Sequence, residues 1–475
     1  MRPRVVLHHL GQIGMLLGVL GIPPVLVALI AGSWSEAAVH AGVATTMAVV
    51  GRAASRRFKA DGMQENEALV ITAGGFVLAA TGAAVSMSSA GLGAFDAIFE
   101  AVSGVTTTGL TVVADPGSAS ASLRFNRAWA QWYGGLGFVT LASAMLGRGH
   151  LVNRIAGMEE DDDDPLGGMR AHGRRVLAIY VVLTVGGVVA LWVLGAGPFD
   201  ALLHALAAVS TGGFSSSSES LSAFGVPVRV AVLVLCVLGA MSFVTIHRTV
   251  RDSWKTAIED VQLRSLLAMV GLAAMLVFLF EWLAGSASGA AGMGNALATA
   301  ASAQSTAGFS TWSVGSLTPA SKIVLLGAMF VGGSVGSSAG GLKQARFLMV
   351  LGTIRRRVIR TGMPRRAVWV PRIAGQKIEP EEARRILGLA FGWVLLIGTV
   401  WLAFAAFGYA PLDALFDVVS ATATVGLSTG VVSAGLEVPL KLLLAVAMLV
   451  GRLELIAMLV LVAPGTWIGR RRSTS

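Results

Sequence analysis

The stretch DAIFEAVSGVTTTGL at residues 96–110 is the first of four related segments in this chain. The others are DALLHALAAVSTGGF at 200–214, NALATAASAQSTAGF at 295–309 and DALFDVVSATATVGL at 413–427. In every copy the opening Asp or Asn lies 13 positions before the glycine of a Thr-x-Gly sequence. One Thr-x-Gly carries no information, but four at the same offset indicate an internal repeat.

Each copy lies between two apolar runs long enough, at about 20 residues, for a helix to cross a hydrocarbon core. The runs before the copies lie near 66–90, 175–197, 263–285 and 385–408, and those after them near 125–147, 226–247, 320–350 and 438–463. Two more runs, near 10–32 and 37–51, precede the first copy, so we expect about ten spans. The segment inside each copy should enter the membrane halfway and return, because about ten helical residues cover only about 15 Å.

The composition also indicates an integral membrane protein. Of 475 residues, 55% are hydrophobic and 13% charged, about half the charged fraction of a soluble domain. The net charge of +10 comes from basic clusters in alternate loops, which argues against a nucleic-acid partner and predicts that both termini are cytoplasmic. The first apolar run lacks a clear cleavage site and is expected to be a retained helix. The single cysteine, Cys236, is expected to be a packed thiol.

Four re-entrant segments imply a shared aqueous axis, because non-helical backbone at membrane depth must be buried by protein or face water. The opening Asp or Asn suits a helix N-cap, and the carbonyl end of the short helix would then point to the axis and favour a cation. Glycine allows positive φ and can keep successive carbonyl oxygens on one side, where they replace an ion's hydration shell. The predicted ion-binding residues are Thr107, Thr108, Gly109, Thr211, Gly212, Gly213, Thr306, Ala307, Gly308, Thr424, Val425 and Gly426.

These segments contain no Asp or Glu between the threonine and the glycine, which favours a large monovalent cation over calcium or magnesium. The alternative is that the glycines only permit close helix packing, the usual role of small residues in membranes.

At these residues the chain resembles the TrkH/KtrB/HKT superfamily of potassium transporters. Three further motifs match: WYGGLG at 132–137, MFVGGSVGSSAGGLK at 329–343 and MLVGRLE at 448–454. The two additional N-terminal spans resemble the TrkH branch, and glycine in all four segments resembles the potassium-selective members. The resemblance implies an all-α membrane fold of four covalently joined helix–pore-loop–helix repeats around a pseudo-fourfold pore, with two N-terminal helices.

The resemblance also implies a gate below the pore segments. The residues of this intramembrane loop would be Gly332, Gly333, Gly336, Ser337, Ser338, Gly340 and Gly341. A run so rich in glycine is a poor helix former, although a tight helix–helix contact is an alternative. Arg452 matches an arginine that acts as an electrostatic barrier in the family, and Lys343 is a second candidate. A structural ion pair of Arg452 is the alternative, with Glu454 a poor partner because it lies about 200° around the helix.

Two other charged features have open interpretations. Glu100, His204 and Asp417 lie four residues after the opening Asp of their segments, where they could form a proton relay or a stabilising polar contact. The acidic run at 159–164 is either a solvated linker or a divalent-cation sensor.

We therefore predict potassium uptake across a bacterial inner membrane, without enzymatic activity or a cofactor bound by this chain, and with potassium as substrate. The resemblance implies contact with membrane lipid, a homodimer, and a cytoplasmic nucleotide-binding regulatory subunit of the TrkA/KtrA type. The alternatives are a sodium-permeable or weakly selective member, and a membrane-embedded enzyme or alternating-access carrier. We expect an N-terminal two-helix region at 1–60 and four repeats, at 61–150, 174–255, 256–365 and 384–475. An acidic linker at 151–173 separates repeats one and two, and a basic linker at 366–383 separates repeats three and four.

Overall fold

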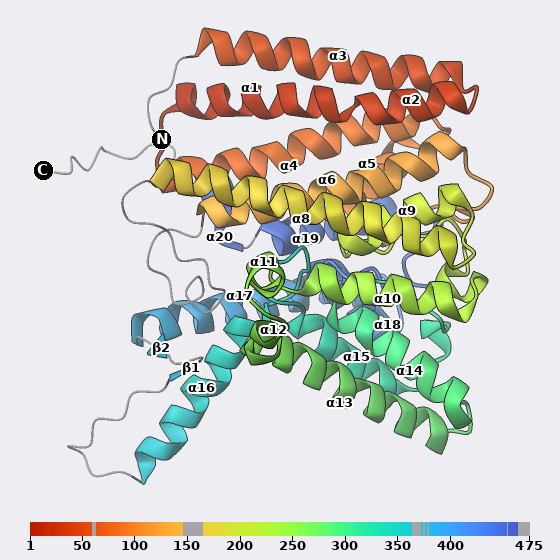
Figure 1. The fold of residues 1–475 in the computed structure, drawn as a ribbon, viewed down its shortest axis with the longest axis vertical. Helices are drawn as coiled ribbons and strands as arrows, with labels where there is room; N and C mark the ends of the chain where they lie inside the picture. The colour runs from red at the N-terminus through yellow and green to blue at the C-terminus, as the bar shows by residue number, and fades with distance from the viewer. Residues whose placement is uncertain are drawn as a thin grey trace, which may run out of the picture.

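The structure is a computed structural model that describes residues 1–58, 63–145, 165–362, 372–373, 376–377, 380–453 and 455–463. It is a bundle of helices (Figure 1). Within these residues the strands are β1 (Arg372–Ile373) and β2 (Gln376–Lys377), which pair antiparallel. The acidic run at 159–164 and Glu454 lie outside the described residues.

The four predicted repeats are present as a long helix, a short helix, a returning segment and a second helix. Repeat one contains α4 (Glu65–Ser88), α5 (Ala94–Val105) and α6 (Ala121–Met145), and repeat two contains α8 (Pro165–Val193), α9 (Pro198–Val209), α10 (Val226–Ala240) and α11 (Phe243–Arg251). Repeat three contains α13 (Val261–Leu283), α14 (Gly289–Gln304), α15 (Pro319–Val331) and α16 (Gln344–Thr361), and repeat four contains α17 (Pro380–Ala406), α18 (Pro411–Thr422), α19 (Val438–Leu453) and α20 (Leu455–Val462).

The short helices α5, α9, α14 and α18, which we call the pore helices, lie at the centre of the protein. Three of them have 12 residues and α14 has 16. Their last two turns are buried on all sides, as from Leu203 to Val209 in α9. A helix that is apolar all round is stable only inside a large protein or a membrane, so the pore helices form the core and the longer helices surround it.

The repeats follow one another around a closed ring. The second helix of each repeat contacts the pore helix of the next: α6 contacts α9, α10 contacts α14, and α15 contacts α18. The last contact is between α19 and α5, which joins repeat four to repeat one. This cyclic order gives the pseudo-fourfold arrangement that four copies of one unit predict.

The N-terminal helices lie outside this ring, at one edge of the bundle (Figure 1). They are α1 (Pro3–Leu20), α2 (Ile22–Ile30) and α3 (Trp34–Arg57). α1 packs against α3 and α4. A Cβ atom on Gly11 would meet the carbonyl oxygen of Gly51, so α1 and α3 lie as close as only glycine allows.

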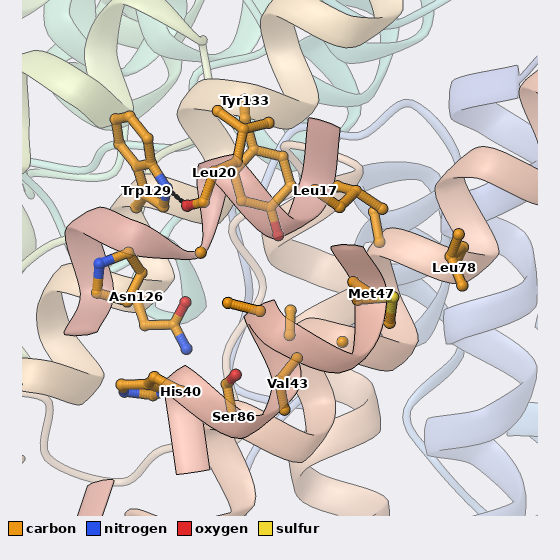
Figure 2. A pocket seen from close by; sticks show the side chains of 16 residues that line it. Leu17, Leu20, His40, Val43, Met47, Leu78, Ser86, Asn126, Trp129 and Tyr133 are labelled. Atoms are coloured by element: carbon orange, nitrogen blue, oxygen red, sulfur yellow. Dashed lines mark hydrogen bonds between the residues drawn. The ribbon is translucent and has the colours of Figure 1, made fainter. Parts of the chain in front are cut away.

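A cavity of about 50 Å³ lies between the N-terminal helices and repeat one (Figure 2). Its walls include Leu17, Met47 and Tyr133, and the side chains of His40 and Asn126 face it. Beside it, Trp129 donates a hydrogen bond to the carbonyl oxygen of Leu20, at the junction of α1 and α2 (2.7 Å). Trp129 also packs against the buried cluster that includes Leu203 and Leu206 of α9, so this bond connects the N-terminal helices to a residue that contacts the second pore helix.

Five helical segments of the described chain are long and apolar enough to cross a membrane, and a sixth if α10 and α11, which meet at 100°, count as one. The five segments are Pro3–Ile30, Asn66–Ser88, Gly173–Val193, Val261–Leu283 and Glu381–Ala406. The expected count of ten also includes α3, α6, α15 and α19. These helices are short or carry arginines, such as Arg124 and Arg127 in α6, so ten spans stays a prediction.

Three short helical pieces lie between the longer helices. A short helix, α12 (Trp254–Glu259), leads into α13, and 3-10 turns lie at η1 (Ser220–Ala223) and η2 (Val314–Ser316). α16 projects away from the bundle (Figure 1) and carries exposed arginines, among them Arg355, Arg357 and Arg360.

Candidate functional site

The glycines of the four Thr-x-Gly sequences form a closed ring, which we call the glycine ring (Gly109, Gly213, Gly308 and Gly426). A Cβ atom on Gly109 would overlap the carbonyl oxygen of Gly212 in the next repeat. A Cβ atom on Gly213 would likewise overlap the carbonyl oxygen of Ala307. A Cβ atom on Gly308 would overlap that of Val425, and one on Gly426 would overlap that of Thr108. The sequence predicted that these segments meet around one axis, and this geometry shows that they do.

Both ends of each Thr-x-Gly turn have positive φ. The glycines have φ values of 72° to 100°, as expected, but the threonines also lie in the left-handed region. Thr107, Thr211, Thr306 and Thr424 have φ values of 51° to 56°. A β-branched residue rarely adopts this conformation and is strained by about 1–3 kcal/mol. The four turns share this strained backbone conformation at equivalent positions.

A helix-ending motif holds each threonine in this conformation. In repeat one, the amide of Thr107 donates to the carbonyl of Gly104 (2.9 Å) and the amide of Thr108 to that of Ser103 (2.8 Å). These are the two bonds of a Schellman motif, in which the left-handed position is usually glycine. The same pair of bonds ends α9, α14 and α18, so the four turns share one backbone geometry.

The oxygen atoms at the ring come from the backbone and from threonine hydroxyls. The hydroxyls of Thr107 and Thr424 are buried and have no hydrogen-bond partner in the described structure. No group of three or more His, Cys, Asp or Glu side chains suited to a metal ion occurs in the part of the chain that is described. The ring can therefore offer a monovalent cation neutral oxygens of the kind that replace a hydration shell.

Gln131, which the sequence analysis did not identify, supports the turn of repeat two from behind. Its amide nitrogen donates to the carbonyl oxygen of Gly212 (2.5 Å), and its amide oxygen accepts from the amide of Phe214 (3.2 Å). The side chain is fully buried. Its position on α6, one residue before the WYGGLG motif, gave no signal because glutamine has no counterpart at that place in the other repeats.

The WYGGLG and MLVGRLE motifs place glycines where second helices meet pore helices. A Cβ atom on Gly134 would overlap the carbonyl oxygen of Val105, the last residue of α5. Gly451 meets the oxygen of Thr422 in the same way, and Gly239 meets that of Val209. These contacts fix the carbonyl ends of three pore helices directly below the ring.

The predicted N-cap role of the opening Asp and Asn residues is wrong. Asp96, Asp200 and Asp413 lie in the first turn of their helices, after N-cap residues that are glycine or alanine, and Asn295 lies inside α14. A carboxylate still interacts favourably with a helix N-terminus at this position. Two of the aspartates bind lysines of a neighbouring repeat instead of capping their own helix.

These two ion pairs join adjacent repeats. Lys322 of α15 binds Asp413 of α18, and Lys441 of α19 binds Asp96 of α5, both at 2.7 Å. Arg229 is the basic residue at the matching place in α10, but the next repeat has Asn295 instead of an aspartate. Arg229 donates to the carbonyl oxygens of Phe224 and Ser222 in its own repeat.

Glu100, His204 and Asp417 make the contacts expected of the polar-contact alternative. Each bonds to a hydroxyl 11 residues further on, just past the glycine of its turn: Thr111 (2.6 Å), Ser215 (3.1 Å) and Ser428 (2.6 Å). Glu100 also accepts from Arg127 at 2.9 Å. These bonds tie each returning segment to its pore helix.

The Gly-rich run interrupts the second helix of repeat three, as its composition predicted. α15 ends at Val331, α16 begins at Gln344, and the residues between them, which we call the 332–343 loop, are mostly buried. Gly332, Gly336, Gly341 and Lys343 have positive φ. The loop is a defined non-helical structure rather than a close contact between two helices.

The 332–343 loop contacts three of the four turns. The amide of Gly340 donates to the hydroxyl of Thr306 (2.7 Å), and that of Gly341 to the carbonyl of Ala423 (3.1 Å). The hydroxyl of Ser338 lies 2.9 Å from the carbonyl oxygen of Val209, at the end of α9. The loop therefore lies directly against the glycine ring, on the side of the pore-helix carbonyl ends.

Arg452 and Lys343 lie at this loop. Arg452 is almost completely buried and donates to the carbonyl oxygen of Ser338 (2.7 Å), while Lys343 donates to that of Ala339. Both line a cavity of about 10 Å³, together with Arg346 and Gly341. Lys343 is buried, so it does not extend to the membrane surface, and one partner of Arg452 is a backbone carbonyl.

Four helix–pore-loop–helix units that close around one axis define a membrane protein of the pore-loop class. The chain belongs to the TrkH family of cation transport proteins, whose family model matches residues 35–466.

Several relatives of this chain are named as transport proteins. The Trk system potassium uptake protein TrkH of Halomonas elongata is 29% identical over 98% of this chain and 99% of its own length. The TrkH protein of Escherichia coli K12 is 29% identical over 78% of this chain and 79% of its own. An uncharacterized cation transporter of Methanocaldococcus jannaschii is 29% identical over 78% of this chain and 76% of its own length.

The fold also matches a solved structure. The crystal structure of the potassium transporter TrkH from Vibrio parahaemolyticus aligns with a TM-score of 0.87, covering 98% of this chain and 100% of that one. The sequences are 24% identical in this alignment, so the match is one of fold.

Proposed function

We propose that this chain carries potassium across the membrane through the glycine ring. The observation that carries the proposal is the closure of four Thr-x-Gly turns, each with positive φ at both ends, around one axis. A site of backbone and hydroxyl oxygens without carboxylates suits a large monovalent cation. The ion-binding residues would be the twelve residues of these turns, at 107–109, 211–213, 306–308 and 424–426.

Potassium, rather than sodium, is supported by two observations. Glycine occupies the last position of all four turns, and the relatives in Halomonas elongata and Escherichia coli are named as potassium uptake proteins. A sodium-permeable protein of the same family is the outcome that ion-flux measurements would distinguish.

The 332–343 loop would act as the gate, and Arg452 with Lys343 as an electrostatic barrier below the ring. The loop bonds to turns of repeats two, three and four, so it has to leave these partners before an ion can pass on that side. Two buried cationic side chains beside it repel a cation at close range. Their donors bind loop carbonyls, which couples the barrier to the position of the loop.

The assembly and orientation are further parts of the proposal. Membership of the TrkH family, and relatives named as members of a Trk system, support a cytoplasmic nucleotide-binding regulatory subunit and a homodimer. The basic clusters of the sequence support a bacterial inner-membrane location with both termini in the cytoplasm.

Growth of a potassium-uptake-deficient bacterium in low-potassium medium tests this function. We expect the wild-type chain to restore growth. A variant with Gly308→Asp, which puts a side chain onto the carbonyl of Val425, should be made in equal amount and fail to restore it. Failure of the wild-type chain, when it is present in the membrane with its regulator, would contradict the proposal.

A further inference from the structure

One carboxylate behind the glycine ring has no basic partner among the described residues. Asp417 lies in the pore helix of repeat four and is fully buried. Its two oxygens accept from the hydroxyl of Ser428 (2.6 Å) and the amides of Thr429 (2.8 Å) and Val432 (2.9 Å). The amides can only donate, and they reach both oxygens, so these bonds offset part of the cost of burying an ionised carboxyl group.

The equivalent positions of the other repeats carry no net charge. Glu100 in repeat one pairs with Arg127, 27 residues further on. His204 in repeat two donates from Nδ1 to the carbonyl of Asp200, so Nε2 can accept from Ser215 in the neutral form of the ring. Repeat three has Thr299, whose hydroxyl donates to the carbonyl of Asn295.

Repeat four lacks the cation that neutralises Glu100. The residue 27 positions after Asp417 is Leu444, which is fully buried in the apolar core. The nearest cation bonded to α18 in the described structure is Lys322, which pairs with Asp413 one turn earlier. Asp413 neutralises it, so no basic side chain is bonded to Asp417 in the described structure.

We infer that Asp417 is the electrostatic determinant of monovalent-cation affinity at the glycine ring; this inference rests on the proposed function. Ser428 is two residues beyond Gly426, so the carboxylate lies about 10 Å from the ring. At an effective dielectric constant of about 20, one negative charge at that distance raises the affinity for a monovalent cation roughly tenfold. The attraction depends on charge and not on ion size, so it acts equally on potassium and sodium.

The inference is tested by removing this charge in two independent ways. Asp417→Asn removes the charge itself, and Leu444→Arg supplies a cation at the place that Arg127 occupies in repeat one. The control Leu444→Met changes the same core position without adding charge. The purified full-length chain is reconstituted in liposomes, and the half-saturating concentrations for potassium and for sodium flux are measured.

We expect both charge variants to raise the two half-saturating concentrations by roughly the same factor, about tenfold. The ratio between the two ions should stay within twofold of wild type, and Leu444→Met should behave as wild type. If Asp417→Asn does not fold, Leu444→Arg decides the result. Unchanged half-saturation, or a changed ratio between ions, would show that Asp417 only shapes the turn and would overturn the inference. Wild-type chain without flux when its regulator is present would overturn the proposed function and this inference with it.

Discussion

Lys441 binds Asp96 across 345 positions of sequence, with 2.7 Å between Nζ and Oδ1. The lysine lies near the start of the second helix of repeat four, and the aspartate lies in the first turn of the pore helix of repeat one. This ion pair closes the ring of repeats. The lysine side chain is 6% exposed and the aspartate 32%, so the two partners differ in how well water can replace the interaction.

This difference predicts unequal effects of removing either partner. Asp96→Asn leaves a buried ammonium without its carboxylate and should destabilise the protein by about 3 kcal/mol. Lys441→Met leaves an aspartate that water reaches and should cost about 1 kcal/mol. Thermal unfolding in detergent measures both, and the double variant should recover part of the larger loss. Equal losses for the two single variants would contradict the asymmetry.

Gly109→Ser should raise sodium permeation. A Cβ atom at this position would overlap the carbonyl oxygen of Gly212, and φ is 85°. The neighbouring oxygen must move, so the cage no longer fits one ion size, and we expect the sodium-to-potassium permeability ratio to rise roughly tenfold, equivalent to about 1.4 kcal/mol.

The control for this substitution is Gly186→Ser. Gly186 lies in α8, and a Cβ atom there would meet no other atom within 4 Å. This variant should keep the wild-type ratio. An unchanged ratio in Gly109→Ser would remove Gly109 from the ion-binding residues.

Ser338→Ala should increase flux in the absence of any activating partner. The Ser338 hydroxyl bonds to carbonyl oxygens of repeat two, at Val209 and Gly239 (both 2.9 Å). Loss of about 1 kcal/mol of closed-state stabilisation shifts the open fraction about fivefold.

Ser337→Ala is the matched comparison. Its hydroxyl donates to Ser334 within the loop (2.6 Å) and does not connect the loop to another repeat. Liposome flux should therefore rise in Ser338→Ala more than in Ser337→Ala. The reverse order would exclude the bond to repeat two as a tether of the gate.

Gln131→Leu should destabilise the protein and weaken ion binding. The substitution leaves the carbonyl of Gly212 and the amide of Phe214 without their buried partner, at a cost of about 2–3 kcal/mol. The exposed Gln12, whose side chain bonds to the ring of His8 one turn earlier in the same helix, provides the control Gln12→Leu. In Gln131→Leu, the unfolding temperature should fall and the half-saturating potassium concentration should rise. In Gln12→Leu, both quantities should stay at their wild-type values.

Repetition made much of the fold and site predictable from the sequence. Four segments at one spacing identified the pore helices, the glycine ring and the cyclic arrangement, and a run of glycine and serine identified the break in repeat three. These features are properties of local sequence, or of copies that must pack alike.

Features that depend on tertiary contacts were not predictable in this way. The N-cap interpretation failed because each pore helix begins before its Asp or Asn. Lys441 and Lys322, from other repeats, bind two of the aspartates. The left-handed threonines contradict local preference, and the helix-ending bonds hold them in this conformation. Gln131 occurs in one repeat, so no comparison among the copies could single it out.

The central claim is that the glycine ring selects potassium, and the reversal potential of the reconstituted chain tests it most directly. Liposomes are prepared with opposed gradients of potassium and sodium. We predict a reversal potential that follows the potassium gradient and moves toward zero in Gly109→Ser. A wild-type reversal potential that follows the sodium gradient would contradict the account.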